Sequence, residues 1–250
     1  MKLPYLLGFG RNCADLPSTP PLLTKLTTVG EHSVIWCESP PMEIFTMKQD
    51  FLLAMLQWFE QIRQLELTVL PIQSGVSVLN EGHLAELLRT YKKELNLCFD
   101  KVEGCSEYCL TIIQKNQNNV HLSYASLKKN VRSGKEYLDR MRMWHQLLER
   151  EVSQAREVIW NFCSRLTPWI KDCWSETPQT RGEGINLGFL VPDTCQQEFI
   201  NELKLLLAEI NVTDKWTGPW LPFHFSSFTL KPESFLIHES LNWGNGRVTS

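Results

Sequence analysis

Hydrophobic positions in the first half of the chain form short apolar runs and helical stripes. Residues 3–9, 34–37, 65–72 and 108–113 are apolar or alternating, which predicts strands. Residues 48–63 and 80–104 space their apolar side chains three and four apart, which predicts two amphipathic helices, the second capped by Asn80. Strands with interposed helices predict an α+β sandwich, which we expect to be ferredoxin-like.

A polar segment divides the pattern in two. Residues 114–119 form a highly polar stretch in which Lys115 is the single charged residue, which is typical of a connection between domains. We therefore predict an N-terminal α+β domain at residues 1–114 and a polar linker at 115–132. A C-terminal α+β domain follows at residues 133–230, with a tail at 231–250.

The C-terminal domain opens with a long predicted helix. Ser133 is followed three residues later by Glu136, the pattern of a capping box. A heptad-like seam then runs to Pro168 in steps of three and four. The seam positions are Leu138, Met141, His145, Leu148, Val152, Ala155, Ile159, Phe162 and Leu166. The seam packs either within its own domain or against another chain as a coiled coil, and His145 is interpreted as a hydrogen-bonded core residue.

Residues 185–191 predict a buried strand, followed by a helix capped by Asp193 and a strand at 212–217. Residues 216–228 then concentrate aromatic side chains around Gly218, Pro219 and Pro222. The prolines disfavour a helix or a central strand, and Gly218 predicts a turn that leaves the strand. Five rings are candidates for partner binding, or alternatively for capping the core of the second domain. They are Trp216, Trp220, Phe223, Phe225 and Phe228.

Composition excludes several classes of function. A net charge of −3 provides no basic field for nucleic acid. No apolar run is long enough for a signal peptide or a membrane span, so we expect a cytoplasmic protein.

The chain carries no recognisable catalytic or metal-binding motif. It lacks a phosphate-binding loop, a metal-binding helix and a nucleophile elbow, and Gly8 and Gly10 are interpreted as a strand-ending turn. The eight cysteines are scattered, and we expect reduced thiols. Cys163 and Cys173 lie ten positions apart, which is typical of neither a zinc site nor a redox pair. We predict no enzyme, with no catalytic residue, cofactor or metal.

Six separated motifs carry a resemblance to a known family. They are Tyr5-Leu6-Leu7-Gly8-Phe9, Val69-Leu70-Pro71-Ile72-Gln73-Ser74-Gly75, Glu107-Tyr108-Cys109-Leu110, Ser133-Gly134-Lys135-Glu136-Tyr137-Leu138, Leu187-Gly188-Phe189-Leu190-Val191-Pro192 and Thr217-Gly218-Pro219-Trp220-Leu221-Pro222-Phe223. In order and spacing they resemble the gas vesicle protein GvpL/GvpF family, accessory proteins needed to build gas vesicles. The chain departs from the family pattern at Gln73 and Ser74, where the family usually has Arg and Phe.

The resemblance implies two α+β domains, the first ferredoxin-like, and no enzymatic activity. It implies association in the cytoplasm with the small apolar protein of the vesicle wall, and other gas vesicle accessory proteins are further candidate partners. Positions expected to be structural within its motifs are Pro71, Gly75, Gly134, Tyr137, Leu138, Gly218, Pro219 and Pro222. The alternatives are a self-associating scaffold that uses the seam of residues 138–166, and, ranked third, an unrecognised enzyme.

Overall fold

The structure is a computed structural model. It describes residues 4–13, 16, 24–38, 57–65, 67–72, 76–78, 80–114, 131, 133–180, 183–210, 212–226 and 236–237. The chain forms two compact units. The first combines Met1–Gly104 with Trp220–Ser250, and the second is Cys105–Pro219. This division differs from the predicted domains. Residues 105–114, predicted in the first domain, belong to the second unit, and residues 220–230, predicted in the second domain, belong to the first unit.

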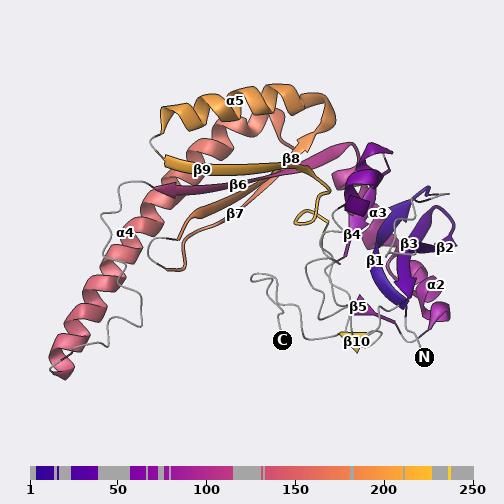
Figure 1. The fold of residues 1–250 in the computed structure, drawn as a ribbon, viewed down its shortest axis with the longest axis horizontal. Coiled ribbons are helices and arrows are strands. Elements are labelled where there is room, and N and C mark those ends of the chain that lie inside the picture. Colours follow the sequence, from indigo (N-terminus) through magenta and orange to yellow (C-terminus); the bar gives the residue numbers. More distant parts are fainter. Residues whose placement is uncertain are drawn as a thin grey trace. The chain divides into compact units, whose positions relative to one another are not determined.

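The first unit is built on an antiparallel sheet (Figure 1). Its strands are β1 (Pro4–Arg11), β2 (Thr24–Val29), β3 (His32–Glu38), β4 (Val69–Pro71), β5 (Val76–Ser77) and β10 (Leu236–Ile237). The order is β10-β5-β1-β3-β2, and β4 also pairs with β1. The predicted strands at 3–9, 34–37 and 65–72 correspond to β1, β3 and the shorter β4. Strand β10 lies in the predicted tail, so this part of the tail completes the sheet of the first unit.

The helices of the first unit pack on a sheet whose strands β1 and β3 are buried on both faces. Residues 57–64 are helical, and two helices follow, α2 (Glu81–Thr90) and α3 (Lys92–Val102). The predicted cap is confirmed, because the His83 amide donates to Asn80 Oδ1 at 3.2 Å. The single helix expected at 80–104 is interrupted at Tyr91. A core cluster contains Tyr5, Leu7, Ile35, Cys37, Trp58, Phe59, Ile62, Val69 and Leu221.

The described element order does not reproduce the ferredoxin-like prediction. In that arrangement a helix separates the first two strands. Among the described elements, β1, β2 and β3 instead follow one another, and the first described helical residue is Gln57. Strand β2 forms a hairpin with β3 around Gly30, whose φ of 65° suits glycine. Its polar, half-exposed sequence gave no apolar run, so the pattern missed it.

The second unit is a four-stranded sheet with two helices on one face (Figure 1). The strands are β6 (Cys105–Gln114), β7 (Asp172–Glu176), β8 (Ile185–Pro192) and β9 (Val212–Trp220), in the order β7-β8-β6-β9. Strand β6, predicted as the last strand of the first domain, pairs antiparallel with β8 along eight residue pairs. This pairing explains why the observed boundary lies at Gly104 rather than after residue 114.

Helices α4 (Gly134–Leu166) and α5 (Gln196–Glu209) cover that face. The predicted start of α4 is confirmed, because the Glu136 amide donates to Ser133 Oγ at 3.1 Å. The C-terminal half of the seam packs within the unit. Its buried members are Ala155, Phe162 and Leu166. They join Tyr108, Leu110, Leu187, Phe189, Phe199 and Leu203 in one core.

The N-terminal half of α4 behaves differently, because the 33-residue helix runs beyond the sheet (Figure 1). Leu138 is 62% exposed. His145, predicted in the core, is exposed and lies edge-on to Trp144 with ring centroids 5.0 Å apart. Trp144, which is not a seam position, is buried instead. Among the described residues, the seam is buried where the sheet lies beneath it.

Two local predictions in the second unit are wrong. Asp193 is not the cap of α5, which starts after a 3-10 turn at Asp193–Cys195. The Asp193 carboxylate instead accepts a hydrogen bond from Ser106 Oγ at 2.8 Å. Strand β9 continues through Gly218 and Pro219 rather than turning at Gly218. Proline is tolerated there because β9 is at the end of the order of the described strands, and edge strands accept proline.

Candidate functional site

The aromatic segment at residues 216–226 contributes to both units. Trp216 belongs to the second unit, whereas the chain from Trp220 onward belongs to the first. The sequence placed the whole segment in the second domain. The correction matters because it changes which core each ring stabilises.

Trp216 packs on the core of the second unit. Its ring centroid lies 6.3 Å from that of Tyr108, and the residue is half-buried. Gly218 lies two residues further along β9, with φ of 131°. A Cβ on Gly218 would lie 2.8 Å from the Glu107 carbonyl oxygen and 2.9 Å from Tyr108 Cδ1. Only glycine therefore fits where β9 passes β6. The following Gly218–Pro219 peptide bond is cis.

Residues 221–226 are fixed to the first unit. Leu221 is part of its core cluster, and Pro222 and Phe225 are buried. The Ser226 amide donates to the Pro222 carbonyl at 3.0 Å, which closes a turn. The Lys101 ammonium lies 5.5 Å from the centre of the Phe225 ring, a cation–π contact.

This turn presents two rings at the surface of the first unit. Trp220 is 37% exposed and Phe223 is 36% exposed. Phe223 rests edge-on against Phe59, with ring centroids 5.0 Å apart. Both rings are held by buried neighbours in the chain. Partner binding therefore stays a prediction for Trp220 and Phe223, while Trp216 and Phe225 contribute mainly to packing. Phe228 lies outside the described residues.

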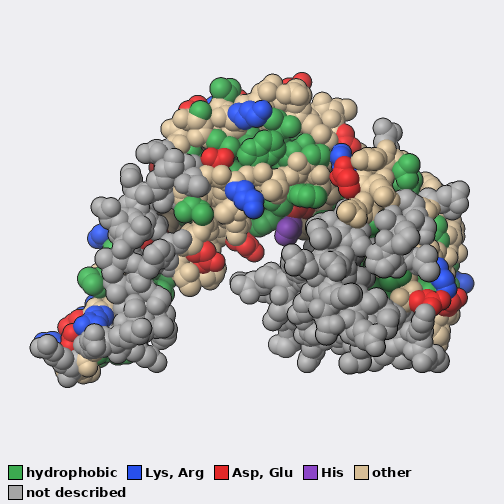
Figure 2. Space-filling view, viewed as in Figure 1, with side chains coloured by type: hydrophobic (Ala, Val, Ile, Leu, Met, Phe, Trp, Pro, Cys, Tyr) green, Lys and Arg blue, Asp and Glu red, His purple; other side chains and the backbone are tan. Residues whose placement is uncertain are grey.

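Other large apolar side chains are exposed in the second unit. Trp160 on α4 is 75% exposed, and Leu205 on α5 is also exposed. Figure 2 shows hydrophobic side chains at the surface around α5, bordered by charged ones. The spacing of apolar residues along these helices predicts that such side chains lie outside the buried stripe, but it does not predict what they contact.

A polar network ties β1 to α3 in the first unit. Arg11 donates to Asp100 Oδ1 at 2.9 Å, to Glu103 Oε2 at 3.2 Å and to Asn96 Oδ1 at 3.1 Å. The buried His32 ring shares Asn96 Oδ1 at 2.8 Å. Because Arg11 is engaged with two side chains of α3 and with Glu103 directly after it, we interpret the network as structural.

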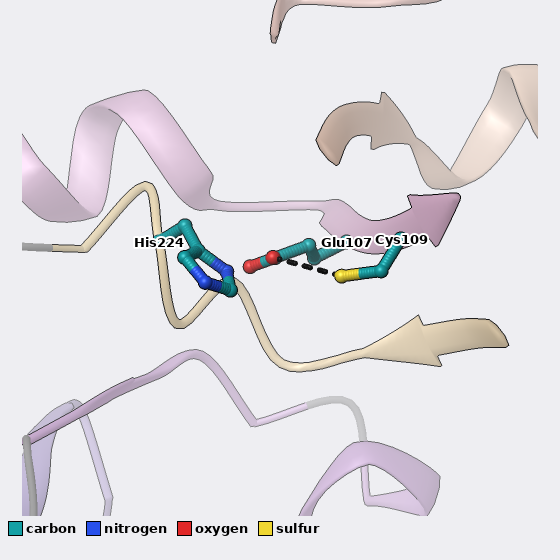
Figure 3. A group of neighbouring side chains, drawn as sticks. All are labelled: Glu107, Cys109 and His224. Atoms are coloured by element: carbon teal, nitrogen blue, oxygen red, sulfur yellow. Dashed lines mark hydrogen bonds between the residues drawn. The ribbon is translucent and has the colours of Figure 1, made fainter. Parts of the chain in front are cut away.

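Glu107 and Cys109 form a second polar pair on β6 (Figure 3). The Cys109 thiol donates to Glu107 Oε1 at 3.4 Å. Burial, with a further effect of the Glu107 carboxylate, raises the pKa of Cys109 to about 12. The thiol therefore keeps its proton at neutral pH, which is the opposite of an activated nucleophile.

The remaining motif residues have varied surroundings. Pro71 ends β4, and Gly134 is the first residue of α4, where an added Cβ would meet no neighbouring atom within 4 Å. Tyr137 is half-buried. Gln73, Ser74 and Gly75 lie outside the described residues, as does the predicted linker apart from Val131. Among the helices described, none has the length and apolar character needed to cross a membrane.

Comparisons with known proteins agree with this fold. The family model for "Gas vesicle synthesis protein GvpL/GvpF" matches residues 24–227. The structure is similar to the crystal structure of the gas vesicle protein GvpF from Anabaena sp. PCC7120, with a TM-score of 0.70 and 18% identity, covering 92% of this chain and 98% of that one. It is also similar to GvpF from Microcystis aeruginosa, with a TM-score of 0.69 and 17% identity, covering 91% and 100% of the two chains.

A comparison with curated proteins finds no match. The family match nevertheless spans most of the sequence, including β2 to β9 and the turn at Pro222. The chain therefore belongs to the gas vesicle protein GvpL/GvpF family and is involved in gas vesicle formation.

Proposed function

We propose that this protein binds the apolar subunit of the gas vesicle wall in the cytoplasm and assists its assembly. The proposed role is binding rather than catalysis. A subunit that builds a gas-filled shell must expose apolar surface before it is incorporated, and such surface aggregates unless a partner covers it.

The observation that carries the proposal is the pair of exposed rings on a fixed turn. Trp220 and Phe223 present apolar area, while Leu221, Pro222 and Phe225 hold the backbone between and beside them in the first unit. Preorganised aromatic residues lose little conformational entropy on binding, which is why they are frequent among the residues that dominate interfaces.

The experiment is co-purification of the tagged full-length chain with a co-expressed wall subunit. The test variant is Trp220→Ala with Phe223→Ala. The matched control is Trp160→Ala, which removes an even more exposed tryptophan from the second unit. Thermal unfolding of each variant checks that the fold is retained.

If these rings bind the wall subunit, the double variant loses capture by about 30-fold or more, since even one such residue contributes about 2 kcal/mol or more. The Trp160→Ala control captures the subunit as the parent does. A folded double variant with undiminished capture would remove these rings from the proposed site. Equal loss in the Trp160→Ala control would instead move the contact to the second unit.

The seam of residues 138–166 is a weaker candidate for self-association. Its C-terminal half is committed to the core of the second unit through Ala155, Phe162 and Leu166. A coiled coil along the whole seam would therefore require that core to open.

A further inference from the structure

The second unit brings together two thiols that the sequence separates. Cys163 lies in the last turn of α4 and Cys173 in the edge strand β7. Their Sγ atoms are 3.3 Å apart, joined by a thiol hydrogen bond. A disulfide has an S–S bond of about 2.05 Å, so closing this gap requires a movement on the order of an ångström.

The backbone on both sides of the pair is well fixed. The Lys171 amide donates to the Leu190 carbonyl at 2.7 Å, which sets the start of β7 against β8. Thr167 Oγ1 donates to the Cys163 carbonyl at 2.7 Å, which closes the end of α4. Both sulfurs pack against the core of the second unit. Their proximity therefore results from the fold rather than from mobile side chains.

We propose that Cys163 and Cys173 form a reversible disulfide that links the end of α4 to β7. The reactant is a small disulfide of the glutathione type. Cys173 is the attacking residue, because burial raises the pKa of Cys163. The Cys173 thiolate forms a mixed disulfide with the reactant and releases one small thiolate. The second cysteine then attacks the protein sulfur of the mixed disulfide and releases the other. Two electrons pass from the protein pair to the reactant, and the two thiol protons end on the two released thiols.

Such exchange requires residues that the reactant can reach, and both members of the pair are half-buried rather than enclosed. The link would close a short loop around the 3-10 turn Thr167–Trp169. The disulfide would fix the C-terminal end of α4 to strand β7. This chemistry is independent of the contact proposed for Trp220 and Phe223.

The test equilibrates the full-length chain in buffers of reduced and oxidised glutathione, followed by acid quenching, alkylation and peptide mapping. Trypsin cleaves after Arg165 and Lys171, so a disulfide joins peptides 157–165 and 172–181, which otherwise separate. The same titration in urea gives the behaviour of the unfolded chain. Cys98→Ser is the matched control because it removes a half-buried thiol from α3 of the first unit.

The disulfide should form in the folded chain at a ratio of reduced to oxidised glutathione at least about tenfold higher than the ratio at which it forms in urea. The reason is that the fold holds the two sulfurs together. Cys98→Ser should give the same result, and Cys163→Ser should abolish the link. The oxidised chain should unfold at a temperature higher by roughly 5–10 °C.

Absence of the linked peptide from the folded chain, or its formation at the same ratio as in urea, would overturn the proposal. This readout uses the parent sequence, so it remains decisive even if Cys163→Ser does not fold. If the oxidised chain unfolded at no higher a temperature than the reduced chain, the claim that the disulfide stabilises the second unit would be refuted.

Discussion

Substitution of Gly218 by alanine should strongly destabilise the second unit. Two penalties add at this position. Its φ of 131° lies in a region that residues with a side chain avoid, which costs about 1–3 kcal/mol. The new Cβ would also lie 2.8 Å from the Glu107 carbonyl oxygen, closer than a carbon can approach without movement of the β6 backbone. We expect a total loss of about 3 kcal/mol, of which overpacking supplies about 1 kcal/mol or more.

Gly134→Ala is the matched control. Gly134 is the first residue of α4, and a Cβ there would meet no atom within 4 Å. Alanine should stabilise the helix by up to about 1 kcal/mol, because glycine loses more backbone entropy on folding. Urea unfolding followed by tryptophan fluorescence and circular dichroism measures both variants. If Gly218→Ala changed the unfolding free energy by less than about 0.5 kcal/mol, the close passage of β9 over β6 would be refuted.

Three further predictions follow from the structure. Leu221→Ala should cost about 2–5 kcal/mol and speed hydrogen exchange in β1 and β3 of the first unit, whereas faster exchange confined to β6 and β8 would contradict its assignment to that core. Arg11→Ala should lower the unfolding free energy by about 1–3 kcal/mol. Arg11→Lys should recover only part of this loss, because lysine keeps the charge but not the forked guanidinium that reaches Asp100 and Asn96. Full recovery of the unfolding free energy in urea would argue against a role for the guanidinium. The rate at which iodoacetamide alkylates Cys163 should rise about tenfold per pH unit between pH 7 and 10. Burial raises the pKa of Cys163 to about 12, and below the pKa the thiolate fraction grows tenfold per pH unit. An alkylation rate that stops rising near pH 9 would contradict the burial.

Local features were predictable where a short stretch of sequence determines them. Ser133 and Asn80 cap their helices because a side-chain oxygen next to an apolar stripe satisfies nearby amides whatever the rest of the chain does. Strands such as β8 carry continuous apolar runs because one sheet face is covered and much of the other is buried. Part of the family resemblance lies in such elements, including β1, β8 and the start of α4.

Features that depend on distant segments were not predictable from the pattern. The apolar run of β6 fits either sheet, and only its antiparallel partner β8 shows that it belongs to the second unit. The approach of Cys163 to Cys173 depends on how the chain turns after α4, and their spacing alone resembles no known pair. His145 fits the seam by position, but a periodic pattern does not reveal where the sheet beneath a long helix ends.

The return of the chain at Trp220 to the first unit explains why one short motif can have both structural and binding residues. Leu221 and Phe225 fill space in that unit, so their loss is a stability effect. Trp220 and Phe223 flank Leu221 and Pro222 and keep more than a third of their surface exposed, so they can lose their side chains with smaller structural cost. If binding depends on these rings, capture of the wall subunit should fall in variants at the exposed positions whose unfolding is nearly unchanged. Variants at the buried positions should lose capture only in proportion to the fraction that is unfolded. A correlation between capture and stability across all four positions would mean that the motif acts only as core.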